Sequence, residues 1–207
     1  IEEFIDCKRD NDQINNFNIS VAITDEFMEA VEGDTDFELT NPRDGQIMKT
    51  VRARDLFRKI VEGAHLNGEP GVVFIDKIID DNPTPQFPIE STNPCSEAHL
   101  PPYDSCNLGS INLERFYRED TADVDWDDLR ETVHTAIRFL DNVIEQNNYP
   151  LPEIDEMSRG NRRGGLGVMG FADLLIKLGI TYDSDEGLAF AERVMKFVDD
   201  EAWEESR

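Results

Sequence analysis

The stretch that decides the fold runs from residue 93 to residue 113 and reads NPCSEAHLPPYDSCNLGSINL. It places an amide, a thiol and a carboxylate at alternate positions, on Asn93, Cys95 and Glu97. In an extended segment, alternate side chains project to the same side. Pro94 restrains its own backbone and biases the residue before it away from a helix. We therefore expect Asn93, Cys95 and Glu97 to converge on one ligand from a stiff loop.

Several other roles remain open for the two cysteines of this stretch. In the first, each cysteine is a small buried hydrophobic residue. If Cys95 were buried in this way, the Glu97 carboxylate on the same face would need a partner, a ligand or contact with solvent. Cys95 and Cys106 can form a disulfide if the loop folds back. Zinc bound by Cys95, His99 and Cys106 would have a spacing that matches no common pattern and lacks a fourth ligand. His99 could also act as the base for a nucleophilic Cys95, a pairing that the nearby prolines disfavour.

Size and composition set the broad class. The 207 residues, 39% of them hydrophobic, suffice for one domain with a core or for a large part of a bigger one. No run of 18 apolar residues occurs, so we expect no membrane span. The first residues resemble no signal peptide and lack an initiator Met, and we expect a piece of a longer chain. Three cysteines are too few for a disulfide framework and predict a cytoplasmic location.

The charge balance is strongly acidic. Asp and Glu number 45 against 20 Lys and Arg, which gives a formal net charge of −25. This disfavours nucleic-acid binding through a basic groove, so no nucleic-acid partner is expected. Repulsion among surface carboxylates is screened at high ionic strength, and the composition therefore predicts a halophilic protein.

Helices alternate with short strands along the chain, which predicts an α/β fold. Apolar periodicity predicts helices over 53–66, 125–146 and 171–178, and a last helix starting at Asp183 or Ser184. In that last helix the residues expected to face inward are Leu188, Ala191, Val194, Met195, Val198 and Ala202. Strands are expected over 19–24, 71–75 and 166–169, a short helix capped by Asp25, and a loop or hairpin over 33–46. Pro150 and Pro152 are expected to end the long helical unit.

Three stretches together resemble a known family. The first is the segment quoted above, the second is NNFNISV at 15–21, and the third is RGGLGVMGFADLL at 163–175. They resemble the catalytic chain of ribonucleotide reductase, and the compact spacing of Cys95 and Cys106 resembles the adenosylcobalamin-dependent class (class II). The resemblance spans nearly all of residues 1–207 and implies the central portion of the catalytic barrel domain, incomplete at both ends. The implied fold is part of a ten-stranded α/β barrel, with Cys95 at the tip of a central finger loop.

The resemblance also implies a chemistry. A thiyl radical on Cys95 would abstract hydrogen from C3′ of a ribonucleotide, with adenosylcobalamin as the cofactor that generates the radical and no metal site on this chain. Glu97 would act as general base on the 3′-hydroxyl, and Asn93 would orient the substrate. The 2′-hydroxyl would leave as water, and Cys106 would supply electrons together with a cysteine expected upstream of residue 1. Because a radical must be shielded from water, the loop is expected in a dry interior.

The remaining implications concern partners and rival assignments. The resemblance implies a nucleotide effector bound mostly outside this chain, a thioredoxin-like reductant, a homodimer, and an inactive fragment when isolated. Ser96, Ala98 and His99 depart from the Gly and Gln-Pro that many relatives carry. The expected activity is that of a ribonucleoside-diphosphate reductase, although the residues do not distinguish diphosphates from triphosphates. The alternatives are a class I catalytic subunit served by a radical-bearing partner subunit, and a non-catalytic acidic domain with structural or zinc-binding cysteines.

Overall fold

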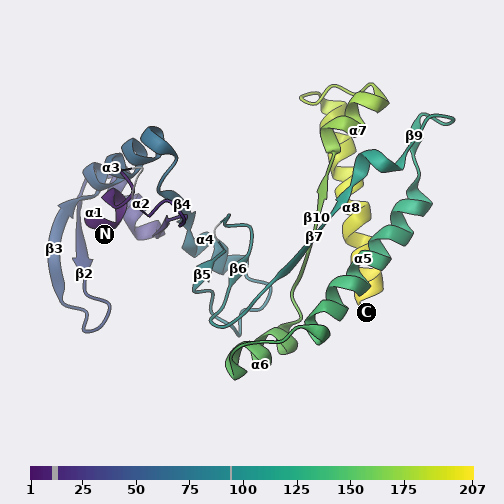
Figure 1. Ribbon diagram of the computed structural model, residues 1–207. Coiled ribbons are helices and arrows are strands. Elements are labelled where there is room, and N and C mark those ends of the chain that lie inside the picture. Colours follow the sequence, from purple (N-terminus) through teal and green to yellow (C-terminus); the bar gives the residue numbers. More distant parts are fainter. Residues whose placement is uncertain (11–13, 94) are drawn as a thin grey trace. The chain divides into compact units, whose positions relative to one another are not determined.

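A computed structural model describes residues 1–10, 14–93 and 95–207, which form two compact units, Ile1–Pro102 and Tyr103–Arg207. Both units mix helices with short strands, so the predicted α/β class is confirmed (Figure 1). Within the described residues, every sheet has two strands. The closed ten-stranded barrel is therefore not formed within the described part of this chain.

Unit 1 is built around a parallel pair of strands, β1 and β4, in register from Ser20↔Gly71 to Ile23↔Phe74. An antiparallel hairpin of β2 and β3 and the helices α2 and α3 lie between these strands in the sequence. The bounds are α1 Glu2–Asp6, β1 Ser20–Ile23, α2 Asp25–Glu32, β2 Asp36–Thr40, β3 Ile47–Arg52, α3 Ala53–Asn67, β4 Gly71–Phe74, α4 Ile75–Asp80, β5 Ser91–Thr92 and β6 His99–Leu100.

The core of unit 1 is formed by one face of each helix against the parallel pair. Its buried residues are Ile5, Val21, Ile23, Phe27, Val31, Ala53, Leu56 and Ile60. The N-cap of α2 is Thr24, whose hydroxyl accepts a hydrogen bond from the Phe27 amide, and not Asp25 as predicted. The strand predicted over 71–75 ends one residue early, because Ile75 begins α4, and only Val73 in β4 is buried.

Unit 2 is built around a second parallel pair, β7 and β10, in register from Gly164↔Asn107 to Met169↔Asn112. Figure 1 shows the long helices α5 and α8 running beside one another next to this pair. The bounds are β7 Asn107–Asn112, η1 Leu113–Phe116, β8 Tyr117–Arg118, β9 Asp123–Val124, α5 Trp126–Gln146, α6 Pro152–Asn161, β10 Gly164–Met169, α7 Phe171–Leu178 and α8 Asp185–Ser206.

The core of unit 2 joins α5, α7 and α8 to the parallel pair. Its buried residues are Ile111, Leu113, Phe116, Val124, Leu129, Val133, Leu174, Leu175, Phe190, Val194 and Val198. Asp125 caps α5 as predicted, through its carboxylate and the Asp128 amide. Leu188 and Met195 are exposed, so the inward face predicted for α8 is wrong at these two positions.

One helix of unit 2 was not expected from the sequence. Pro152 begins α6 instead of ending the preceding unit. Proline fits the first turn of a helix, since the amide that it lacks has no partner there. This helix carries Ser158, a buried hydroxyl beside Cys106, and therefore helps to form the second cysteine site.

Candidate functional site

Asn93, Cys95 and Glu97 lie together on the connection between β5 and β6, which pair antiparallel with Thr92 opposite His99. The Ser96 amide donates to the Asn93 carbonyl (3.0 Å), and the Ala98 amide donates to the Asn93 side-chain oxygen (3.0 Å). The connection is therefore a tight turn, and the predicted extended segment is wrong. Pro94, on which part of that prediction was based, lies outside the described residues.

Ser96 explains why the chain turns here. Its φ of 64° lies in the left-handed region, which side chains other than glycine rarely adopt. The Ser96 hydroxyl lies 3.3 Å from the hydroxyl of Thr92, and this contact helps to hold the strained residue. Glycine is the residue that this backbone conformation favours.

The side chains of the turn are accessible. Cys95 and Glu97 are exposed, whereas Asn93 is half-buried. Cys95 is therefore not part of the core that the described residues form. The carboxamide oxygen of Asn93 is used to close the turn, which leaves its amide nitrogen as the group available to a ligand. The turn thus presents a hydrogen-bond donor, a thiol and a carboxylate, without the dry surroundings that were predicted.

Cys106 belongs to unit 2, one residue before β7. It is half-buried, and its thiol lies 3.6 Å from the carbonyl of Asn107. It opens on a cavity of about 110 Å³ that is also lined by Ser105, Ile144, Tyr149, Ser158 and Arg163. A Cβ atom on Gly165 would lie 3.2 Å from the Cys106 sulfur and 2.5 Å from a Leu108 methyl. Glycine at this position therefore makes room for the sulfur.

The neighbours of Cys106 are anchored by polar contacts that the sequence did not predict. The Asp104 carboxylate is fully buried and pairs with the guanidinium of Arg163, while the Asn161 amide donates to it at 2.8 Å. The Ser105 and Ser158 hydroxyls lie 2.7 Å apart, and the Asn107 amide donates to the Leu140 carbonyl. These bonds join residues 33 to 59 positions apart, a separation at which local periodicity gives no signal.

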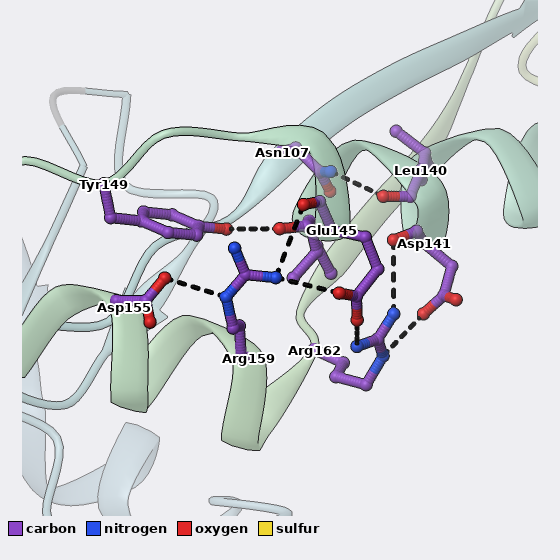
Figure 2. Close-up of polar contacts among 9 residues, drawn as sticks. Asn107, Leu140, Asp141, Glu145, Tyr149, Asp155, Arg159 and Arg162 are labelled. Atoms are coloured by element: carbon purple, nitrogen blue, oxygen red, sulfur yellow. Dashed lines mark hydrogen bonds and ion pairs between the residues drawn. The ribbon is translucent and has the colours of Figure 1, made fainter.

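Two further arginines fix α6 against α5 (Figure 2). Arg159 donates to Asp155 and to Glu145, both at 2.8 Å. Arg162 donates to Asp141 at 2.8 Å and also pairs with Glu145. The hydrogen bond from Arg162 lowers the pKa of the Asp141 carboxyl. The network holds Ser158 beside Cys106, but its own carboxylates are satisfied by arginines.

One group of side chains in the described residues has the proximity of metal ligands, namely His134, Glu201 and Glu204. Glu201 is instead bonded to the His134 ring and to the Arg130 guanidinium, both at 2.9 Å. A cation would have to displace the arginine, so we interpret the group as an ion-pair network between α5 and α8. The zinc alternative for Cys95, His99 and Cys106 draws on residues of both units and stays untested.

No helix in the part of the chain that the structure describes combines the length and apolar character needed to cross a membrane. The structure is a mixed α/β protein with Cys95 exposed on a turn and Cys106 beside a small cavity. Comparison with known proteins gives the family. Residues 1–207 match the sequence model of the family described as ribonucleotide reductase, barrel domain. The chain therefore belongs to the ribonucleotide reductase family.

The curated relatives agree with this assignment. A vitamin B12-dependent ribonucleoside-diphosphate reductase of Thermoplasma acidophilum is 48% identical over 209 residues, which cover 100% of this chain and 27% of the relative. A protein of the same name from Mycobacterium tuberculosis is 46% identical, over 99% of this chain and 30% of the relative. A ribonucleoside-diphosphate reductase subunit alpha from Chlamydia pneumoniae is 38% identical over 158 residues, 74% of this chain and 15% of the relative. The chain thus spans less than a third of the length of these relatives.

Proposed function

We propose that this chain is the part of an adenosylcobalamin-dependent ribonucleotide reductase that carries the hydrogen-abstracting thiol, Cys95. The observation that carries the proposal is the turn at 93–98, which presents an accessible thiol next to a carboxylate and an amide donor. Family membership supports the reaction, and the names of the relatives from Thermoplasma acidophilum and Mycobacterium tuberculosis support the cofactor.

The accessible thiol of Cys95 fits the proposed cofactor. Cys95 lies exposed on the turn, where its sulfur would be accessible to a bound cofactor. When bound, adenosylcobalamin supplies the initiating radical through homolysis of its cobalt–carbon bond. The contribution of this chain is the sulfur atom, and we assign none of its described residues as a ligand of the cobalamin.

Three residues of the turn divide the first step of the reaction between them. The Cys95 sulfur takes the hydrogen atom from C3′ of the ribose, a reversible step because the S–H and activated C–H bonds have similar strengths. Glu97 accepts the proton of the 3′-hydroxyl. The amide nitrogen of Asn93 donates a hydrogen bond to the substrate, since its oxygen is already bonded within the turn.

Cys106 takes part in the reduction itself. The C2′–OH bond breaks, and the oxygen leaves as water. Two thiols supply two electrons and two hydrogens, so that a C2′–H bond and one disulfide form. We assign Cys106 as one of these thiols, with the second on another part of the enzyme. A thioredoxin-like dithiol would then reduce the disulfide and become oxidised in turn.

The larger architecture follows from the family. We infer that the parallel pairs β1–β4 and β7–β10 are four of the strands of a ten-stranded barrel, with residues 1–207 as the central portion of that domain. The 93–98 turn is then the tip of the finger loop, and other segments of the barrel supply the shielding that this chain lacks. We further propose a cytoplasmic homodimer with an effector nucleotide bound mostly outside these residues, and an isolated chain without turnover. The acidic surface makes the enzyme halophilic.

A class I catalytic subunit is the alternative, and the relative from Chlamydia pneumoniae keeps it open. Addition of adenosylcobalamin to the purified full-length enzyme separates the two. We expect deoxyribonucleotide formation only with the cofactor, whereas activity that instead needs a second protein subunit would favour class I. Stoichiometric zinc on Cys95 and Cys106 would favour the non-catalytic alternative.

Substitution of the three cysteines tests the assigned roles. Cys95→Ser removes reduction, because an alcohol O–H bond is too strong to form the needed radical. Cys106→Ser stops multiple turnover. Cys7→Ser is the matched control, since Cys7 follows α1 at a distance of 88 positions from Cys95 and is given no role. Near-normal turnover by Cys95→Ser would refute the proposal.

A further inference from the structure

The lining of the cavity beside Cys106 includes Arg163, whose ion pair with the buried Asp104 has no role in the proposed reaction. The Asp104 side chain is fully buried, and its carboxylate accepts hydrogen bonds from the Ser105 amide, from Asn161 and from Arg163. Burial of a carboxylate costs several kcal/mol unless it is paired and hydrogen-bonded, so this pair is held in place by the surrounding structure.

Arg163 lies next to the thiol. It directly precedes β10, whose first residue Gly164 pairs with Asn107, so that Arg163 and Cys106 occupy neighbouring positions just before the two strands. Both residues line the cavity of about 110 Å³.

The other walls of the cavity carry little charge. α5 contributes Val143 and Ile144, and α6 contributes Ser158. Tyr149 is the remaining titratable group of the lining, and the Arg159 guanidinium lies over its ring. The nearby acids of α5, Asp141 and Glu145, are bonded to Arg162 and Arg159 (Figure 2). Arg163 is therefore the charged residue among the described residues that line the cavity, and Asp104 is its ion-pair partner outside that lining.

We propose that Asp104 and Arg163 are positioning residues that set the reactivity of the Cys106 thiol. The positive charge of Arg163 favours the thiolate form of Cys106, the form that takes part in thiol–disulfide exchange, and the carboxylate of Asp104 offsets part of that charge. This inference rests on the proposed role of Cys106 as an electron donor, but its test does not depend on turnover.

The test is the alkylation of Cys106 by iodoacetamide in the reduced full-length protein, measured from pH 5 to 10 by mass spectrometry of the Cys106 peptide. In this reaction the thiolate sulfur bonds to the CH₂ carbon, the C–I bond breaks, and iodide leaves. Arg163→Gln removes the favourable charge, so we expect the rate at pH 7 to fall about three- to tenfold and the half-maximal rate to move to higher pH.

Asp104→Asn gives the opposite expectation. It breaks the same ion pair but leaves Arg163 uncompensated, so the half-maximal rate should move to lower pH and the rate at pH 7 should rise. A merely structural pair would give shifts in one direction for both variants, because both would loosen the same segment. Opposite shifts support the inference, and shifts of the same sign or none overturn it.

Two more variants complete the design. Arg162→Gln is the matched control, because it removes the same charge one position away, on a side chain directed to Asp141 and Glu145. It should leave the pH profile of Cys106 unchanged. Arg163→Lys retains the charge and should keep the wild-type pH profile of Cys106 alkylation. It provides a second test if Arg163→Gln does not fold. A shift for Arg163→Lys as large as that expected for Arg163→Gln would overturn the inference. Loss of turnover in Cys106→Ser tests the proposed function separately.

Discussion

Replacement of Glu201 by Gln should destabilise unit 2, and the loss should depend on pH. Glu201 is buried on α8 and joins that helix to Arg130 and His134 on α5. The hydrogen bond from Arg130, with a further one from His134, lowers the pKa of the Glu201 carboxyl. Gln retains the shape and one acceptor oxygen but removes the charge.

The magnitude follows from the exposure of the two partners. Hydrogen bonds to charged groups contribute about 1.5–3 kcal/mol when buried, whereas exposed ion pairs contribute about 0–1 kcal/mol. Glu201 is 11% exposed and Arg130 is 43% exposed, so the pair lies between these limits. We expect Glu201→Gln to lower the free energy of unfolding by about 1–2 kcal/mol at pH 7, which corresponds to about 4–16 °C in the midpoint of thermal unfolding for a unit of this size.

The sign of the pH dependence follows from the lowered pKa. A carboxyl with a depressed folded-state pKa contributes stability above its unfolded pKa of about 4.3 and loses it as the pH falls through the folded value. The wild type and Glu201→Gln should therefore differ most above about pH 5. The difference should narrow as the pH is lowered below about 4, where Glu201 becomes protonated.

Tryptophan fluorescence can follow the unfolding of unit 2 and so test this prediction. Both tryptophans of the chain, Trp126 and Trp203, lie in unit 2, so their emission reports the unfolding of that unit. Glu192→Gln is the matched control, because it removes an exposed carboxylate from the same helix and should change stability by less than about 0.5 kcal/mol. Equal midpoints for the wild type and Glu201→Gln at pH 7, or a difference independent of pH, would refute the reasoning.

Three further predictions concern backbone and surface. Gly170→Ala should lower the free energy of unfolding, followed by tryptophan fluorescence, by about 2–3 kcal/mol, because φ is 69° and the new Cβ would lie 2.0 Å from the Asn112 side-chain oxygen. Gly160→Ala, whose new Cβ would lie in open space on α6, should raise the free energy of unfolding by about 0.5–1 kcal/mol. Ser96→Gly should leave amide hydrogen exchange of the 93–98 turn unchanged, whereas Ser96→Val should speed it severalfold, since β-branched residues disfavour the left-handed region. Raising NaCl from about 0.01 to 0.5 M should raise the unfolding midpoint, because screening reduces the repulsion within a net charge of −25.

Each of these three predictions has an outcome that contradicts it. Equal effects of alanine at Gly170 and Gly160 would show that the close approach to Asn112 is not a constraint. Unchanged exchange in Ser96→Val would show that the turn does not need a left-handed residue. A midpoint that falls with added salt would remove the argument for a halophilic surface.

The long helices could be predicted from the sequence, because their apolar faces and caps are local signals. α5 follows Asp125 and α8 follows Ser184, both of which accept a hydrogen bond from an amide in the first turn. α6 could not be predicted, because a proline such as Pro152 can follow the end of one helix as well as begin the next. The burial of Leu188 and Met195 could not be predicted from their apolar character, because exposed leucine and methionine side chains are common.

The proximity of Asn93, Cys95 and Glu97 could be predicted from the sequence, but the geometry of the segment that carries them could not. Motif resemblance indicated Asn93, Cys95 and Glu97, and the structure does place them on one turn. The turn itself was missed because its left-handed residue is Ser96, whereas glycine would have signalled it. The pair of Asp104 and Arg163 depends on the tertiary fold, since 59 positions separate its members.

The most direct test of the central claim follows the hydrogen atom at C3′. The full-length enzyme, supplied with adenosylcobalamin and a nucleotide carrying tritium at C3′, should exchange tritium out of the substrate when Cys95 carries the radical. We expect Cys106→Ser to retain this exchange while multiple turnover stops, and Cys95→Ser to show none. Tritium exchange by Cys95→Ser at the wild-type rate would contradict the assignment of this sulfur as the hydrogen-abstracting group.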